Sequence, residues 1–201
     1  MKVVAITSEK GGVGKSTLAV HLAGAAHAQG LTPLLVDEDG RVGSSLRWAR
    51  RAGALPFEVV EADDVRPKKL ARYDLLLLDT EGRPRRKELR QLAGRADLLL
   101  VPSGVSALEL DATRELLDFL HEEGAARKTR VVLTRVPPVG HAAEDAREDL
   151  REAGLTVCNT VVRQYAAFQR AAEAGVLVRD VPGERSASAW SDVLRLAQEL
   201  W

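Results

Sequence analysis

The chain has 201 residues, of which 45% are hydrophobic and 29% are charged, and basic and acidic side chains number 29 each. This composition is typical of a globular domain and excludes a disordered chain. The single cysteine excludes a fold held by internal disulfides. A net charge of zero also excludes attraction of nucleic acid by the field of the whole molecule, so any such binding requires a local patch.

The sequence lacks the signals that direct a protein to a membrane or out of the cell. Lys2 is followed by a short apolar run that polar residues soon break, unlike a signal peptide. No apolar run approaches the ~18 residues that a membrane span needs. We expect the lone Cys158 to be a buried thiol on a strand. These features favour a cytoplasmic protein.

Short apolar runs alternate with longer amphipathic stretches along the chain. The runs are continuously apolar, which is typical of parallel strands covered on both faces. We expect strands at 3–7, 34–36, 57–60, 75–78, 98–101, 131–134 and 156–162. We expect helices at 18–29, 42–51, 85–93, 108–123, 142–153, 165–174 and 187–200. This alternation predicts one α/β domain over residues 1–201, with a mostly parallel, twisted sheet and helices on both faces.

A glycine-rich loop joins the first predicted strand to the first predicted helix. Its sequence is Ser8-Glu9-Lys10-Gly11-Gly12-Val13-Gly14-Lys15-Ser16-Thr17. Such a loop aims backbone N–H groups and a helix N-terminus at one point, which suits a phosphate chain. Lys15 is expected to reach the β- and γ-phosphates, and the Ser16 hydroxyl to bind Mg²⁺. The general P-loop pattern has glycine in place of Glu9, and Lys10 is an unusual second lysine.

Carboxylates follow two other predicted strands. Asp79 follows the strand at 75–78, in the Walker B position that supports a metal; the alternative is a residue that only caps the next turn. Asp37 and Asp39 follow the strand at 34–36, where one of them could orient the attacking water or hold metal-bound waters; the alternative is a solvated acidic turn. Parallel strands bring their carboxyl ends to one edge, so we expect these residues near the P-loop.

The doubled-lysine loop, together with Val36-Asp37-Glu38-Asp39 and Leu77-Leu78-Asp79-Thr80, closely resembles the ParA/MinD family of deviant Walker A ATPases. Weaker stretches at 96–102, 131–135, 171–181 and 186–200 follow in the same order as in the family, so the resemblance covers essentially the whole chain. The chain is most similar to the small ParA partition ATPases that lack an N-terminal DNA-binding domain. A single-domain P-loop NTPase fold is implied.

The resemblance implies an ATPase that forms a homodimer around two ATP molecules with Mg²⁺. In the ATP state it would bind non-specific DNA at the nucleoid, and a ParB-like or equivalent adaptor would stimulate hydrolysis to partition a plasmid, chromosome or protein cargo. Lys10 would cross to the partner's nucleotide, like an arginine finger, and Asp39 would position the attacking water. The resemblance implies nucleotide contacts for Lys10, Gly11, Gly12, Val13, Gly14, Lys15, Ser16, Thr17, Arg135 and Pro182, and metal contacts for Ser16, Asp37 and Asp79.

Two departures from the family pattern lie in the switch loops. Gly40-Arg41 replaces the usual Pro-Gln, and Glu81 replaces a usual proline. We expect nucleotide binding to be retained, and hydrolysis and its stimulation by a partner to be affected. Glu81 is either a bystander or an extra carboxylate near the metal.

Basic side chains gather directly after the predicted Walker B strand. Residues 83–95 carry six basic side chains and one acidic side chain, whereas residues 163–201 carry five of each. The segment 83–95 is either a solvated face or a DNA-binding patch. The candidate DNA contacts are Arg83, Arg85, Arg86, Lys87, Arg90, Arg163 and Arg170.

The last predicted helix carries an apolar stripe that includes Trp190, Val193 and Leu200. Membrane-surface helices prefer Lys and Arg on their polar face, and this helix has only Arg195 there, so we expect the stripe to dock on the core and no membrane partner. We also expect Trp48 to pack its helix onto the core or a dimer partner, and the four histidines to be surface or helix residues rather than metal ligands.

Two alternative functions remain open at this stage. The same fold serves small-molecule ATP-dependent ligases and kinases, and it also serves MinD-like positioning ATPases. Lys10 and the lack of an evident inserted substrate subdomain favour the dimeric switch over the metabolic enzyme.

Overall fold

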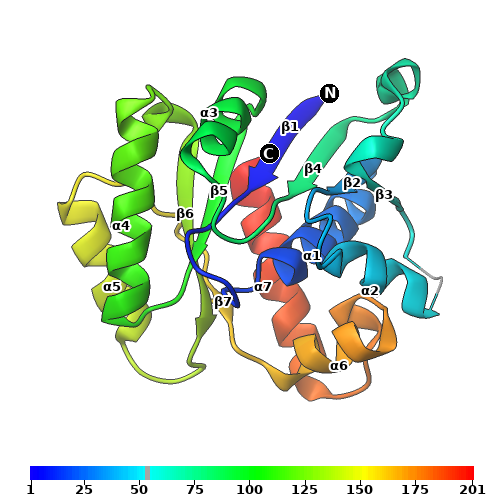
Figure 1. Ribbon diagram of the computed structural model, residues 1–201. Helices are drawn as coiled ribbons and strands as arrows, with labels where there is room; N and C mark the ends of the chain where they lie inside the picture. The colour runs from blue at the N-terminus through cyan, green and yellow to red at the C-terminus, as the bar shows by residue number, and fades with distance from the viewer. Residues whose placement is uncertain (53–54) are drawn as a thin grey trace.

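The computed structural model describes residues 1–52 and 55–201. The described residues form a seven-stranded parallel sheet in the order β3-β2-β4-β1-β5-β6-β7 (Figure 1). The strands are β1 (Lys2–Ile6), β2 (Pro33–Asp37), β3 (Glu58–Glu61), β4 (Leu75–Asp79), β5 (Leu98–Ser103), β6 (Thr129–Val136) and β7 (Val162–Arg163). The helices are α1 (Lys15–Ala28), α2 (Ser44–Ala52), α3 (Arg86–Arg95), α4 (Ala107–Glu122), α5 (Ala142–Glu152), α6 (Ala166–Ala174) and α7 (Glu184–Leu200). The predicted α/β fold class is confirmed.

The sheet separates two hydrophobic layers because successive side chains of a strand point to opposite faces. In β4, Leu75 and Leu77 pack in the layer formed with α1, α6 and α7, whereas Leu76 and Leu78 pack in the layer formed with α3, α4 and α5. Figure 1 shows these two groups of helices on opposite sides of the sheet. Burial on both faces explains why the strands read as continuous apolar runs.

The predicted strand at 156–162 is wrong in its extent. Val157 forms only an isolated bridge with Val131, and a ladder with β6 begins only at β7, with a shift of register between Thr134 and Val136. The intervening N–H groups of Asn159 and Thr160 donate instead to the carboxylate of Glu199 on α7, at 2.6 and 2.9 Å. A carboxylate from a distant helix therefore replaces the strand ladder.

Two predicted boundaries also differ from the structure. β5 continues through Pro102 to Ser103, where it pairs with β6. Proline lacks an N–H group, but none is needed at Pro102 because the neighbouring β1 pairs with β5 only as far as Leu100. The helix after the glycine-rich loop begins at Lys15 rather than Leu18, with Gly14 as its N-cap. The lysine of the loop thus stands on the first turn of α1.

The apolar stripe of α7 is buried against the core, as predicted. Val193, Leu196 and Ala197 are fully buried there. The end of the helix is held by Lys2, whose Nζ donates to the carbonyl of Leu200 at 2.6 Å. Among the described residues, no helix combines the length and apolar character that crossing a membrane requires.

His21, on α1, is fully buried and joins four segments, so it is not a surface residue. Its Nδ1 lies 2.7 Å from the carbonyl of Thr17, and its Nε2 accepts the N–H of Val178 at 3.0 Å. The rings of Trp48 and Phe168 meet it edge-on, at 5.4 and 5.0 Å between centroids. Trp48 also donates to a backbone carbonyl in the same chain, so it packs α2 onto the core as predicted. Because Nε2 of His21 accepts a hydrogen bond, its imidazole must be neutral, with the proton on Nδ1.

Burial lowers the pKa of His21 from 6.5 to about 4. As pH falls, His21 is protonated in the unfolded chain before it is protonated in the native protein. The free energy of unfolding should therefore fall as pH is lowered from about 6.5 to about 4, by about 3 kcal/mol in total. We expect His21→Gln to remove this contribution and His27→Gln, at an exposed position of the same helix, to keep it.

Urea unfolding at neutral pH and at about pH 4.5 measures the effect. The comparison is made between variants, because the raised pKa of buried Asp79 stabilises the native protein as pH falls and so acts in the opposite sense. An unchanged pH dependence in His21→Gln would contradict the assignment.

Candidate functional site

The loop between β1 and α1 has a backbone that requires glycine at two positions. Gly12 and Gly14 have φ angles of +78° and +89°, which side chains with a Cβ rarely adopt. The carbonyl of Val13 accepts a hydrogen bond from the Thr134 hydroxyl at 2.8 Å, which fixes the loop to the end of β6. The loop thus has the shape of a phosphate-binding turn at the start of a helix.

The ammonium group of Lys15 is largely buried at the base of this loop. Its Nζ donates to the Ser8 hydroxyl at 3.0 Å, and that hydroxyl donates to the carbonyl of Lys10 at 2.8 Å. Burial lowers the pKa of Lys15, and the nearby carboxylates of Asp79 and Asp39 oppose this shift. The cation is therefore held in place before any phosphate arrives.

Asp79 ends β4 and is almost completely buried. Its Oδ2 accepts a hydrogen bond from the Ser45 hydroxyl at 2.6 Å, whereas its Oδ1 is buried without a partner among the described residues. Burial raises the pKa of Asp79 to about 6, and the hydrogen bond from Ser45 and the nearby Ser16 hydroxyl oppose the shift. An unpartnered buried carboxylate oxygen is unfavourable, and Mg²⁺ prefers such oxygen ligands. The residues present therefore fit a Mg²⁺ ion held by Asp79 and Ser16.

Asp37 and Asp39 have different surroundings. Buried Asp37 accepts the N–H of Asp39 with Oδ1 and the N–H of Leu46 with Oδ2, both at 3.0 Å. Asp37 therefore shapes the loop between β2 and α2, and its metal contact stays a prediction. Asp39 lines the open cleft, and its Oδ1 accepts the N–H groups of Arg41 and Val42 at 3.2 and 2.9 Å.

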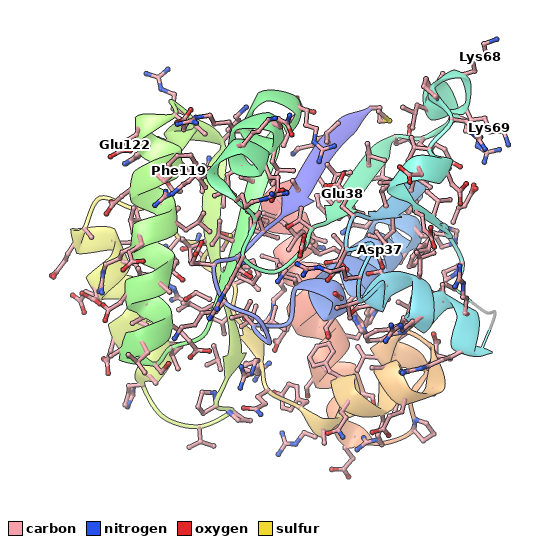
Figure 2. The ribbon with its side chains drawn as sticks, viewed as in Figure 1. Asp37, Glu38, Lys68, Lys69, Phe119 and Glu122 are labelled. Atoms are coloured by element: carbon pink, nitrogen blue, oxygen red, sulfur yellow. The ribbon has the colours of Figure 1, made fainter. Side chains whose placement is uncertain are left out.

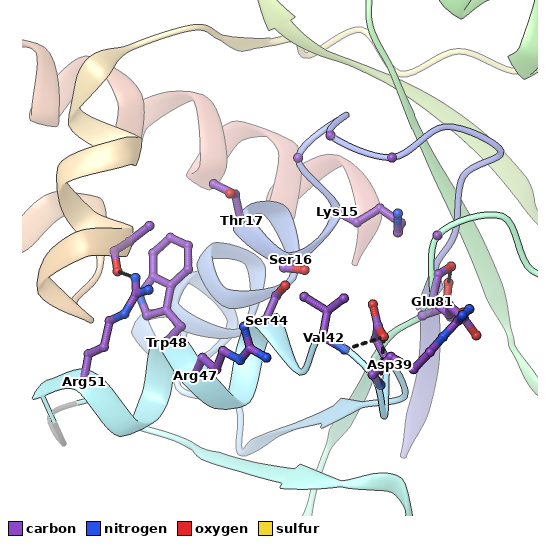
Figure 3. A pocket seen from close by; sticks show the side chains of 17 residues that line it. Lys15, Ser16, Thr17, Asp39, Val42, Ser44, Arg47, Trp48, Arg51 and Glu81 are labelled. Atoms are coloured by element: carbon purple, nitrogen blue, oxygen red, sulfur yellow. Dashed lines mark hydrogen bonds and ion pairs between the residues drawn. The ribbon is translucent and has the colours of Figure 1, made fainter.

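Lys15, Ser16 and Asp39 line one cleft of about 770 Å³ at the carboxyl edge of the sheet (Figure 3), whereas buried Asp37 and Asp79 are outside its lining. Figure 3 shows Lys15 and Glu81 at one end of the cleft and Trp48 and Arg51 at the other. The predicted residues that line it are Gly11, Gly12, Gly14, Lys15, Ser16, Thr17 and Asp39. Sequence reasoning did not place Ser44, Arg47 and Arg51 here, nor Ser45 against Asp79, because no motif marks them.

A second, smaller cleft of about 240 Å³ adjoins the first, since Gly12, Gly14 and Thr17 line both. Its lining includes the predicted Val13 and Arg135, and Arg135 also donates to the carbonyl of Gly12 at 3.0 Å. Most of the surface that lines this cleft is apolar, which suits a flat ring. The predicted Pro182 is exposed and lines neither cleft, so the structure does not bring it to the site.

Lys10 is half-buried, and its amine has no hydrogen-bond partner within the described part of the chain. It is also absent from the lining of both clefts. Lys15 therefore lines the cleft of its own chain, whereas Lys10 does not.

The predicted basic residues divide into paired and unpaired ones. Arg85 pairs with Glu88, and Arg90 with Glu123, each at 2.7 Å. The remaining members of the segment's candidate set, which have no ion pair among the described residues, are Arg83, Arg86 and Lys87.

Two aromatic and ionic contacts further separate these candidates. Arg86 stacks on the ring of Phe119, 4.2 Å from its centroid, and Figure 2 shows Phe119 on the side of α4 that faces α3. Arg163 is instead bound to the fully buried Asp192 at 2.6 Å, while Arg170 is exposed on α6. The structure does not bring Arg163 and Arg170 together with the unpaired residues Arg83, Arg86 and Lys87.

The two buried aspartates predict opposite responses to the same substitution. Above about pH 6 a charged Asp79 is unfavourable in its buried position, so Asp79→Asn should stabilise the nucleotide-free protein by roughly 1–3 kcal/mol at neutral pH. The gain should shrink as pH falls below about 6. Asp37→Asn should instead destabilise by about 1–3 kcal/mol, because an amide nitrogen would face a backbone N–H.

Chemical unfolding of the two variants and of the unaltered protein measures both effects. A destabilised Asp79→Asn protein would show that the carboxylate is satisfied in the nucleotide-free state, contrary to the geometry.

Comparisons with known proteins indicate a family of nucleotide-binding proteins. The family described as the CobQ/CobB/MinD/ParA nucleotide binding domain matches residues 4–178. The chain is 35% identical to maintenance of carboxysome distribution protein A of Gloeobacter kilaueensis, over 99% of this chain and 94% of that protein.

Two solved structures share the fold. The MinC:MinD cell division complex of Aquifex aeolicus has a TM-score of 0.78 at 18% identity, covering 98% of this chain and 96% of that one. The ATP complex of a Cyanothece McdA variant has a TM-score of 0.69 at 17% identity, covering 100% and 97%. The chain therefore belongs to the CobQ/CobB/MinD/ParA family of nucleotide-binding proteins, among its P-loop ATPases of the ParA/MinD type.

Proposed function

We propose that the chain is an ATP-dependent positioning switch that works as a homodimer. ATP with Mg²⁺ closes the dimer, the closed dimer binds non-specific DNA, and hydrolysis stimulated by an adaptor protein releases it. The observation that carries the proposal is that Lys15 and Ser16 line one cleft with buried Asp79 close to both of them, while the other lysine of the loop, Lys10, has no role in its own cleft.

Each side chain has a distinct task in this proposal. The pre-positioned ammonium of Lys15 binds the β- and γ-phosphates, and Thr17 contacts the α-phosphate. Mg²⁺, when held by Ser16 and Asp79, supplies neutralisation of charge on the phosphate oxygens. Asp39 orients the attacking water from the wall of the cleft. The apolar cleft beside Arg135 receives the base.

Exposed apolar side chains support a dimer that covers the carboxyl edge. Val42, Leu108 and Val139 are 47%, 73% and 88% exposed and stand in the segments that follow β2, β5 and β6. These segments lie at the same edge as Lys10, because all strands are parallel. A second protein that covers this edge would bury these side chains. A second copy of the chain there would also bring Lys10 to its partner's phosphates.

The name of the carboxysome relative favours a protein assembly as cargo over a plasmid or chromosome. In this proposal the ATP-bound dimer coats the DNA of the nucleoid. An adaptor on the cargo stimulates hydrolysis, which depletes the bound dimer nearby, and the cargo moves toward DNA that still carries it. If the protein is instead a ligase or kinase, turnover will require a small acceptor molecule and will not respond to DNA or to an adaptor.

Lys15→Ala should abolish nucleotide binding, because it removes the cation that meets the phosphates. Lys10→Ala should keep nucleotide binding by the monomer but lose the ATP-dependent dimer and at least about 10³-fold of stimulated turnover, as for other cationic fingers. Light scattering after gel filtration, with ADP and with a non-hydrolysable ATP analogue, measures the dimer. A Lys10→Ala protein that still dimerises would refute the role of Lys10 across the interface.

DNA binding is expected to depend on the unpaired cations of α3. The double substitution Arg86→Ala with Lys87→Ala should weaken ATP-dependent binding and reduce its salt dependence, because each lost phosphate contact lowers the slope by about 1. Lys68→Ala with Lys69→Ala is the matched control, since it removes two exposed cations at a distant corner of the molecule (Figure 2). Equal losses in both double variants would mean that total charge, not this patch, governs binding.

A further inference from the structure

The two departures from the family pattern meet in the structure. Arg41, from the loop between β2 and α2, forms an ion pair with Glu81, from the segment after β4. Both residues line the larger cleft. The side chain of Arg41 is 83% exposed and that of Glu81 is 34% exposed, so the pair stands at the mouth of the cleft rather than in its wall.

The pair lies at the end of the cleft that Lys15 marks. A Cβ on Gly82, the residue after Glu81, would lie 3.6 Å from Nζ of Lys15. The N–H of Arg83 donates to the carbonyl of Ser8 at 3.3 Å, which holds this segment against the base of the P-loop. On the opposite side, Oδ1 of Asp39 accepts the N–H of Arg41 at 3.2 Å. Both partners therefore belong to segments that backbone hydrogen bonds hold beside Lys15 and Asp39, where the proposed function sets the terminal phosphate.

We propose that Arg41 is a specificity-determining residue that recognises the γ-phosphate and is held in reserve by Glu81. Without a γ-phosphate, Glu81 binds the guanidinium. A bound ATP offers a second, more highly charged acceptor at the same end of the cleft, and Arg41 exchanges Glu81 for it. ADP offers no such acceptor, so the Arg41–Glu81 pair persists. The inference rests on the proposed function, in which the ligand is an adenine nucleotide.

Relative energies favour this exchange. An exposed ion pair contributes about 0–1 kcal/mol, so Glu81 holds Arg41 only weakly. A guanidinium forms paired, charge-assisted hydrogen bonds with phosphate as it does with carboxylate, and the γ-phosphate carries more negative charge than Glu81. Glu81 limits the gain, because the γ-phosphate must displace it and then lies near an unpaired carboxylate. The pair therefore sets how strongly the cleft prefers three phosphates to two.

The test is the ratio of affinities for ADP and for a non-hydrolysable ATP analogue, AMPPNP, measured by titration calorimetry with Mg²⁺ at fixed salt. Arg41→Ala should weaken AMPPNP binding about tenfold, which corresponds to about 1.4 kcal/mol, and leave ADP binding nearly unchanged. Glu81→Gln should strengthen AMPPNP binding several-fold with little effect on ADP. Arg41→Lys keeps the charge without the planar fork and should fall between Arg41→Ala and the unaltered protein.

Arg50→Ala is the matched control. Arg50 is an exposed arginine that pairs with Glu61 at 3.5 Å outside the larger cleft, so its removal should not change the ratio. An Arg41→Ala protein with the ratio of the unaltered protein would overturn the inference and leave the proposed function standing. Weaker AMPPNP binding by Glu81→Gln would also overturn it, since Glu81 would then act as a ligand rather than a competitor. Failure of the unaltered protein to bind either nucleotide would overturn the proposed function itself.

Discussion

The register between three parallel strands fixes the distance between the buried cation and the buried carboxylates of the site. Ile6 of β1 pairs with Asp79 of β4, and Asp79 pairs with Asp37 of β2. A slip of one residue would turn Asp79 to the other face of the sheet. The four leucines that precede Asp79 are buried on both faces, and the run is bounded by exposed Asp74 and by Asp79, so a slip would draw a carboxylate into one of the two hydrophobic layers.

The parts of the fold that can be predicted from the sequence are those determined by residues close together in the chain. The strand and helix alternation, the glycine loop and Asp79 follow from neighbouring residues alone. Side chains that meet from distant segments could not be predicted, such as Glu199, which takes two N–H groups from the last predicted strand. Arg163 looked free for DNA, yet Asp192, 29 positions along the chain, binds it in the core. The same limit hid the Arg41–Glu81 pair, because each residue alone reads only as a departure from a motif.

The two edges of the sheet are stabilised by different means. At the amino edge, Asp74 accepts the N–H of Thr32 at 2.8 Å, and Asp97 accepts the N–H of Val3 at 2.7 Å, so carboxylates that precede one strand hold the start of its neighbour. Each is a charge-assisted hydrogen bond to backbone at an ordered strand end. These contacts, together with the packing of α7, hold the starts of the strands in place at the amino edge.

At the carboxyl edge the loops after β2 and β4 are joined by the exposed ion pair of Arg41 and Glu81. Nearby, Arg135 at the end of β6 pairs with Glu109 in the first turn of α4. Such pairs contribute little free energy, so these loops belong to the part of the molecule that opens most readily. His21 lies beneath them and ties α1 to α2 and to the segment before α7 through buried contacts. In the proposed function, rearrangement on nucleotide binding would be confined to the loops that carry Asp39, Arg41 and Glu81, while α1 would keep the phosphate-binding loop in place. A small ligand would then change the surface offered to a partner without any change in the core.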